Sequence, residues 1–358
     1  MSRYLSKDES TAIKGLLIFI IILGHNAILT NSVGCIQPYL YLFHVKIFFI
    51  LPFFYRTQTI SFKDCVKKNF IRLYYPFLLF FFLLSILYYF MNSTIVDPNK
   101  IANGLDNIQN NTLLYYIITV ITGNSYLIDH FTGYQFLWFL PVIFALMIVK
   151  NYIQDKKALK TVSIIVGLFL YVILYTMKTD QATQLLHFNV MLFSPFAILQ
   201  GIAMFFLGYT CSTIILCDKF SKNITITFSF VFIILSVFLL YKLNQDPQFI
   251  KTFKYAPVIK FVIPYLFMGL LYTIKRPLSK ISVLLKLGEL SLPIYIFSTL
   301  ICTIFYLIFN RLNAITPLYG IIAQILITVI SYYLALSIQR IPLIRKKLFP
   351  RNKEELYK

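Results

Sequence analysis

Four ionisable side chains lie in or beside long apolar stretches of the sequence. His25, His44 and Lys46 stand between apolar neighbours, and Lys14 stands near the start of the first stretch. A charged or strongly polar side chain inside a lipid bilayer is costly unless it is paired or faces water, so such residues are often functional. Each of the four is therefore a candidate for binding or catalysis.

Lys14 and His25 are spaced so that one helix would present both from the same face. His25 follows Lys14 by 11 positions. At about 100° per residue, this separation is about 20° more than three full turns, with a rise of about 16 Å. A donor molecule could then place an anionic end at Lys14 and a reactive end at His25. The equally weighted alternative is a lysine that reaches the membrane surface and a histidine hydrogen-bonded to a neighbouring helix.

The second apolar stretch contains His44 and Lys46. If the first two stretches form antiparallel helices, His25 and His44 lie at a similar depth and could meet. The simpler interpretation of His44 is a core histidine whose hydrogen bonds are satisfied locally. Lys46 lies two positions further, about 200° around a helix from His44. We therefore expect it to face different surroundings, where it either reaches the membrane surface or pairs with a neighbour.

Acidic side chains are nearly absent from the apolar stretches, since only Glu289, at the start of the ninth, comes close. The sequence therefore offers no buried His–Asp pair of the serine-hydrolase type. The four histidines and five cysteines form no metal-binding or disulfide pattern, so we expect no metal. Membrane topology or an anionic cofactor would explain a basic cluster made of Lys63, Lys67, Lys68 and Arg72.

The composition indicates which elements must position these residues. Apolar residues make up 59% of the 358 and charged residues 13%, and the mean hydropathy is +0.76. A soluble domain has about 25% charged residues, so the chain requires a bilayer as solvent. A short apolar patch, 113–122, cannot cross alone. The sequence predicts an all-α polytopic membrane bundle of about ten transmembrane helices, at about 12–30, 39–55, 71–91, 134–150, 161–177, 190–217, 224–242, 257–274, 288–310 and 316–338.

Lysine and arginine set the expected orientation, because cytoplasmic loops of membrane proteins carry an excess of them. With a cytoplasmic N-terminus, 25 of the 33 basic residues lie in cytoplasmic segments, 7 in external ones and Lys46 in a span. We expect a multi-pass protein of the inner (plasma) membrane with both termini cytoplasmic, made of one domain, 1–340, and a basic tail, 341–358. The net charge is +20, but the basic residues lie mostly in short loops between apolar stretches, so nucleic-acid binding is not expected.

Five sequence motifs occur in order along the chain. The first pairs Lys14 with His25 across ten intervening residues. The others are, in order, Phe43-His44 with Phe48-Phe49, Arg72 to Phe77, Leu137 to Leu140 with Trp138, and Gly288 to Tyr295 with Glu289. Together these motifs resemble those of membrane acyltransferase family 3. The likeness extends over residues 12–340, nearly the whole chain.

The resemblance implies an O-acyltransferase, of the O-acetyltransferase type, that moves an acyl group from cytoplasmic acetyl-CoA to a hydroxyl of a cell-surface or lipid-linked glycan. His25 would be the catalytic general base, and the donor would be bound by Lys14, Arg72 and Lys68. Candidates for the substrate site are His44, Trp138, Glu289 and Tyr295. The expected partners are the bilayer, an acyl-CoA and a glycan or glycolipid, with a homo-oligomer left open.

The chain departs from the family pattern at four places. Ser298 stands where many members have a histidine, so any catalytic role of that histidine cannot be assigned to this chain. Asn69 and Thr11 replace an arginine and an acid, and Pro52-Phe53 replaces Ser-Gly. Two alternatives to an enzyme remain open. A transporter or glycan flippase without catalytic activity would have the same composition and buried charges, and a receptor or assembly subunit that has lost activity would fit the missing histidine at position 298. The scarcity of glycine (12 residues) and the lack of a visible internal repeat argue against a transporter.

Overall fold

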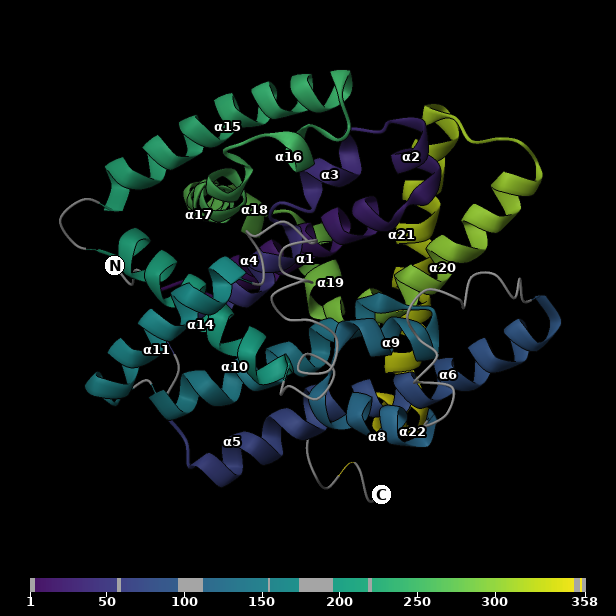
Figure 1. Ribbon diagram of the computed structural model, residues 1–358, viewed down its shortest axis with the longest axis horizontal. Helices are drawn as coiled ribbons and strands as arrows, with labels where there is room; N and C mark the ends of the chain where they lie inside the picture. Colours follow the sequence, from purple (N-terminus) through teal and green to yellow (C-terminus); the bar gives the residue numbers. More distant parts are fainter. Residues whose placement is uncertain are drawn as a thin grey trace. The chain divides into compact units, whose positions relative to one another are not determined.

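The computed structural model describes residues 4–56, 59–95, 112–153, 155–173, 196–217, 221–350 and 355. Helices account for 86% of it (Figure 1), and no strand occurs among the described residues. The described part contains eight helical segments long and apolar enough to cross a membrane. The predicted all-α polytopic membrane fold is therefore confirmed. The eight segments are Ile36–Phe54, Phe62–Phe90, Phe136–Ile153, Phe196–Ile215, Lys222–Gln245, Ala256–Thr273, Ser291–Arg311 and Pro317–Arg340.

The chain divides into two compact units. The described residues of the first unit lie within Met1–Gln58 and Phe206–Pro342, and those of the second lie within Thr59–Leu174, Lys178–Phe205 and Leu343–Lys358. Lys14, His25, His44 and Lys46 all belong to the first unit. The candidate chemistry around these four residues can therefore be followed within one compact body.

Helix α1 (Lys7–His25) is the element of the first unit that carries both Lys14 and His25. A capping box starts it: Ser6 Oγ accepts from the backbone N–H of Glu9 at 3.2 Å, and the N–H of Ser6 donates to the Glu9 carboxylate at 2.9 Å. Buried side chains then recur at helical spacing, at Ile13, Leu17, Ile18, Ile21 and Ile22. α1 packs chiefly against α18 (Lys275–Ser279), α19 (Ser282–Glu289) and α20 (Ser291–Arg311).

Two glycines allow α1 and α19 to approach at backbone distance. A β-carbon on Gly15 would lie 1.9 Å from the carbonyl oxygen of Leu284, and one on Gly288 would lie 1.8 Å from the carbonyl oxygen of Thr11. No side chain fits at either distance, and a backbone carbonyl cannot swing aside as a flexible side chain can. The contact therefore fixes the part of α1 that carries Lys14 against α19.

The first two apolar stretches contain helix breaks that the sequence did not predict, although Ile36–Phe54 is still long and apolar enough to cross a membrane. α1 ends at His25, and α2 (Ala27–Ser32) follows after Asn26, whose side chain caps it by accepting from the N–H of Leu29 at 3.3 Å. The second stretch is divided into α3 (Ile36–Leu40), α4 (His44–Ile50) and the 3₁₀ turn η1 (Leu51–Phe54). Apolar composition alone cannot reveal such breaks, because the residues on both sides are equally apolar.

Two helix pairs complete the first unit. α15 (Ser221–Gln245) packs along α17 (Ala256–Thr273), with the short α16 (Phe249–Thr252) between them in the chain (Figure 1). α20 packs along α21 (Pro317–Arg340), which also contacts α2. In the α2–α21 contact, Gly320 lies against the backbone of Leu29, since a β-carbon there would lie 2.6 Å from the Leu29 Cα.

The second unit contains the remaining helices. The predicted short apolar patch at 113–122 is helix α8, which packs against α9. α5 and α6 are joined by a π-helical turn, η2 (Phe70–Tyr74), that carries Arg72. α14 (Phe196–Ile215) contributes its first residues to this unit and the residues from Phe206 to the first. The other elements are α5 (Phe62–Asn69), α6 (Tyr75–Ile95), α8 (Thr112–Thr122), α9 (Ser125–Thr132), η4 (Gln135–Trp138), α10 (Phe139–Ile153), α11 (Lys157–Tyr171) and α22 (Pro342–Leu348).

Candidate active site

His25 and His44 lie beside each other, each at the edge of a helix break. His25 is the last residue of α1, and His44 is the first residue of α4. Their ring centroids are 6.4 Å apart, and the ring of Tyr41 lies 6.3 Å from that of His25 and 4.9 Å from that of His44. The expected meeting of the two histidines is confirmed, with Tyr41 as a third ring that the sequence did not suggest.

The hydrogen bond of His44 determines which of its ring nitrogens is free to accept a proton. Nδ1 lies 2.7 Å from the carbonyl oxygen of Leu40, one turn earlier in the chain. A carbonyl oxygen can only accept, so in neutral His44 the proton is on Nδ1 and the lone pair is on Nε2. The side chain is 2% exposed, and Nε2 has no hydrogen-bond partner in the described part of the chain. His44 therefore presents a buried, unsatisfied acceptor.

The break after His25 is held in place by a buried amide network. The Asn26 side chain is 1% exposed and donates from Nδ2 to the carbonyl oxygen of Gly320 at 2.9 Å and to Oε1 of Gln324 at 3.3 Å. Gln324 in turn donates from Nε2 to the carbonyl oxygen of Phe19 in α1, also at 3.3 Å. Because Asn26 directly follows His25, this network fixes the backbone that carries the histidine. An asparagine after the histidine is a helix-capping signal that could have predicted the break.

Lys14 is half-buried at the other end of the same helix face. α1 is unbroken between Lys14 and His25, so the predicted shared face is confirmed, with a separation along the axis of about 16 Å. The Lys14 ammonium lies 5.4 Å from the ring centroid of Tyr55, within the range of a cation–π interaction. The close packing of Gly15 on α19 leaves this end of α1 little freedom to move.

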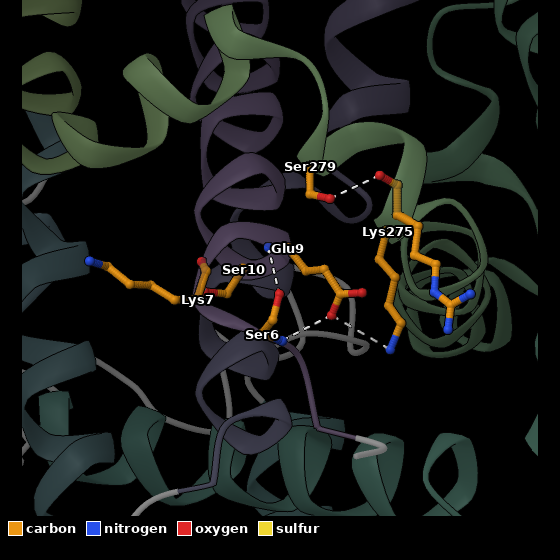
Figure 2. A network of polar contacts seen from close by, with 7 residues as sticks. Ser6, Lys7, Glu9, Ser10, Lys275 and Ser279 are labelled. Atoms are coloured by element: carbon orange, nitrogen blue, oxygen red, sulfur yellow. Dashed lines mark hydrogen bonds and ion pairs between the residues drawn. The ribbon is translucent and has the colours of Figure 1, made fainter. Parts of the chain in front are cut away.

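An ion pair ties the start of α1 to α18, as Figure 2 shows. The ammonium of Lys275 lies 3.8 Å from the Glu9 carboxylate that also completes the capping box, and 3.9 Å from the ring centroid of Tyr272. Burial lowers the pKa of Lys275, and the Glu9 carboxylate acts in the opposite direction. The same view shows a hydrogen bond within α18, in which the Ser279 hydroxyl donates from Oγ to the carbonyl oxygen of Arg276 at 2.9 Å. Glu9 therefore serves structure at this end of the helix.

Lys46 binds a backbone carbonyl in a proline-interrupted helix. Its ammonium donates to the carbonyl oxygen of Lys260 in α17 at 3.1 Å. In a regular helix that oxygen would accept from the N–H of residue 264, but residue 264 is a proline, which has no N–H. Of the two interpretations left open by the sequence, pairing with a neighbour is therefore the correct one. The pairing serves the fold of α17, and the sequence could not have identified the partner.

The other predicted site residues are placed in different surroundings. Tyr295 is 5% exposed near the start of α20 and Glu289 is exposed at the end of α19, both in the first unit. Ser298, the departure from the expected histidine, is buried and donates to the Tyr295 carbonyl at 3.2 Å. The remaining three belong to the second unit and are the exposed Lys68 and Arg72 and the half-buried Trp138.

Among the residues that the structure describes, no group of three His, Cys, Asp or Glu side chains could hold a metal ion.

A comparison with protein families matches residues 8–336 to the model of an acyltransferase domain. The chain belongs to acyltransferase family 3. Curated proteins and solved structures gave no match. As a member of family 3 with several apolar helices, the protein is a multi-pass membrane acyltransferase.

Proposed function

We propose that this family 3 member is an O-acetyltransferase of the plasma membrane. It would transfer the acetyl group of cytoplasmic acetyl-CoA to a hydroxyl of a cell-surface or lipid-linked glycan. The observation that supports this proposal is the single helix face of α1 that carries a half-buried cation at Lys14 and an imidazole at His25. An acyl donor with phosphates at one end and a thioester at the other could place its phosphates at the Lys14 ammonium and its thioester at the His25 imidazole.

The proposed reaction uses His25 as a general base. His25 takes the proton of the acceptor hydroxyl while the oxygen attacks the carbonyl carbon of the thioester. The carbon–sulfur bond breaks, an ester forms on the acceptor, and the thiolate of coenzyme A takes up the proton from His25. Histidine suits this exchange because its ordinary pKa lies near neutrality. The hydrogen bonds of the described residues include none to a ring nitrogen of His25, which leaves both nitrogens available to substrate.

The proposed donor site begins at Lys14. Its ammonium would bind a phosphate of coenzyme A. The family resemblance also implies donor binding by Lys68 and Arg72, which are exposed cations of the second unit. Arg72 lies in a π-helical turn, an irregularity often found at functional sites. With both termini in the cytoplasm, as the charge bias indicates, the Lys14 end of α1 faces the compartment that contains acetyl-CoA.

The test is transfer of labelled acetyl from acetyl-CoA to surface glycan in membrane vesicles. His25→Gln retains a polar side chain of similar size but cannot take the proton, so turnover should fall by about 10²–10⁴-fold. Lys14→Ala should raise the apparent KM for acetyl-CoA. His130→Gln, at a half-buried histidine of α9, is the matched control and should leave both parameters unchanged.

Two outcomes would contradict the proposal at different levels. Near-normal turnover of the His25→Gln variant would remove His25 as the base while leaving an acetyltransferase. A wild-type protein that incorporates no acetyl group, although it is folded and inserted, would overturn the acetyltransferase and favour a transporter.

A further inference from the structure

The buried Nε2 of His44 lies close to Gly24 of α1. A β-carbon built on Gly24 would lie 3.8 Å from His44 Nε2, 3.8 Å from Leu40 Cδ1 and 3.8 Å from Tyr41 Cε2. Nε2 therefore lies near the backbone of α1 one residue before His25, at a position where Gly24 has no side chain. No hydrogen bond joins the two imidazoles, since Nε2 has no partner among the described residues.

An acceptor buried in this way is suited to receive a hydrogen bond from a donor that binds beside it. Taking a ring nitrogen out of water without a replacement hydrogen bond is unfavourable, and such groups in native proteins are usually satisfied. The proton on Nδ1 is already committed to the Leu40 carbonyl, so Nε2 can only accept. A partner of Nε2 must therefore carry an O–H or N–H group and approach it beside Gly24 and Tyr41.

We propose that His44 binds a second hydroxyl of the acceptor, next to the hydroxyl that His25 deprotonates. This inference rests on the proposed acetyl transfer and specifies its substrate class. The reacting hydroxyl has a single proton, which goes to His25, so the hydrogen bond to His44 must come from another group. Neighbouring hydroxyls are the characteristic pattern of sugars. The acceptor is accordingly a polyhydroxylated molecule, and an isolated alcohol would leave Nε2 unsatisfied.

The pair of variants His44→Asn and His44→Gln separates the two nitrogens of the ring. The amide nitrogen of asparagine can replace Nδ1 as the donor to Leu40, but nothing then stands at the position of Nε2. Glutamine places an amide oxygen near the position of Nε2 and loses the bond to Leu40. If His44 serves only to hold the fold, the His44→Asn variant should retain more activity than His44→Gln. If Nε2 binds the acceptor, the His44→Gln variant should retain more.

The assay uses wild-type and variant proteins in membrane vesicles, with labelled acetyl-CoA and deacylated surface glycan from the producing cells. His44→Asn should raise the apparent KM for glycan by 10-fold or more and leave the KM for acetyl-CoA unchanged, whereas His44→Gln should retain a KM for glycan closer to that of the wild type. This order follows because a lost hydrogen bond to an uncompensated buried group weakens binding by about 10-fold or more.

A second variant keeps the test independent of the stability of the histidine variants. Gly24→Ala adds one methyl group at ordinary contact distance from Nε2, in a helix where alanine is favoured over glycine. The protein should fold as the wild type does and lose affinity for glycan, because the methyl group occupies the place of the hydroxyl. Gly34→Ala, whose β-carbon would meet only Pro247 at 3.4 Å and 4.0 Å, is the matched control and should behave as the wild type.

The outcomes distinguish this inference from the proposed function. An unchanged KM for glycan in both His44→Asn and Gly24→Ala would overturn the role of His44 alone. A raised KM for acetyl-CoA in place of glycan would also overturn it, because the donor of the hydrogen bond would then be an amide N–H of coenzyme A. A folded wild-type protein without acetyl transfer would overturn the proposed function and this inference with it.

Discussion

Lys46 and Pro264 should be energetically coupled, because the lysine replaces the N–H that the proline lacks. In the wild type, the Lys260 carbonyl accepts from the Lys46 ammonium at 3.1 Å. Lys46→Met removes this charged donor from a part-buried carbonyl. A hydrogen bond from a charged donor contributes about 1.5–3 kcal/mol. Removal of a buried cation offsets part of this loss, so we expect a net destabilisation of about 1–2 kcal/mol.

Pro264→Ala should rescue the Lys46→Met variant. An alanine at 264 provides a backbone N–H to the Lys260 carbonyl and restores the regular helical bond of α17. The substitution should therefore stabilise the methionine variant more than it stabilises the wild type, where the lysine already occupies the oxygen. The measurement is a double-mutant cycle of unfolding free energies in detergent micelles, and we expect a coupling of about 1–2 kcal/mol.

Pro257→Ala is the matched control for the cycle. Pro257 stands in the first turn of α17, where a proline breaks no internal hydrogen bond. It should show no coupling to Lys46→Met. Additivity within about 0.5 kcal/mol for the Lys46–Pro264 pair would refute the reasoning, and so would a coupling of equal size for Pro257.

Two further predictions concern the positions of His25 and Lys14. Asn26→Ala removes a helix cap and a buried amide donor, so it should lower the free energy of unfolding by about 1–3 kcal/mol and reduce turnover by displacing His25; the exposed Asn31→Ala in α2, measured in the same unfolding and transfer assays, should do neither. Equal behaviour of the two asparagine variants would contradict this role. Gly15→Ala should force α1 and α19 apart, because its β-carbon would lie 1.9 Å from the Leu284 carbonyl; it should reduce thermal stability and raise the KM for acetyl-CoA, and a protein of wild-type stability and KM would show that the contact is not as close as described.

The elements that could be predicted from the sequence are those set by local composition. Continuous apolar stretches predicted the long membrane helices, such as Ser291–Arg311 and Pro317–Arg340. The breaks at Asn26 and at Tyr41 to Phe43 were missed because hydropathy does not change across them. Asn26 carried a usable signal, since asparagine is a preferred N-cap residue. The turn at Tyr41 to Phe43 contains no glycine or proline, and hydropathy and turn residues gave no indication of it.

The candidate site was predictable only where it depends on one helix. The shared face of Lys14 and His25 follows from the helical repeat, and the repeat holds because α1 is unbroken between them. The partner of Lys46 was beyond prediction because it depends on how α4 packs against a helix more than 200 residues later in the chain. The lone pair of His44 was hidden for a different reason, since the bond of Nδ1 to Leu40 requires the turn that sequence reasoning missed.

The glycine contact between α1 and α19 also limits how this protein can evolve. With a backbone carbonyl in the place of a β-carbon, positions 15 and 288 are closed to every larger residue. Substitutions that are accepted in this part of the fold must therefore fall at other positions. Ile18 and Ile22 of α1 are buried but already carry large side chains, so a smaller residue can replace them at the cost of a cavity. Helix α1 thus combines a position where any larger residue is excluded with positions where the side-chain volume can be reduced.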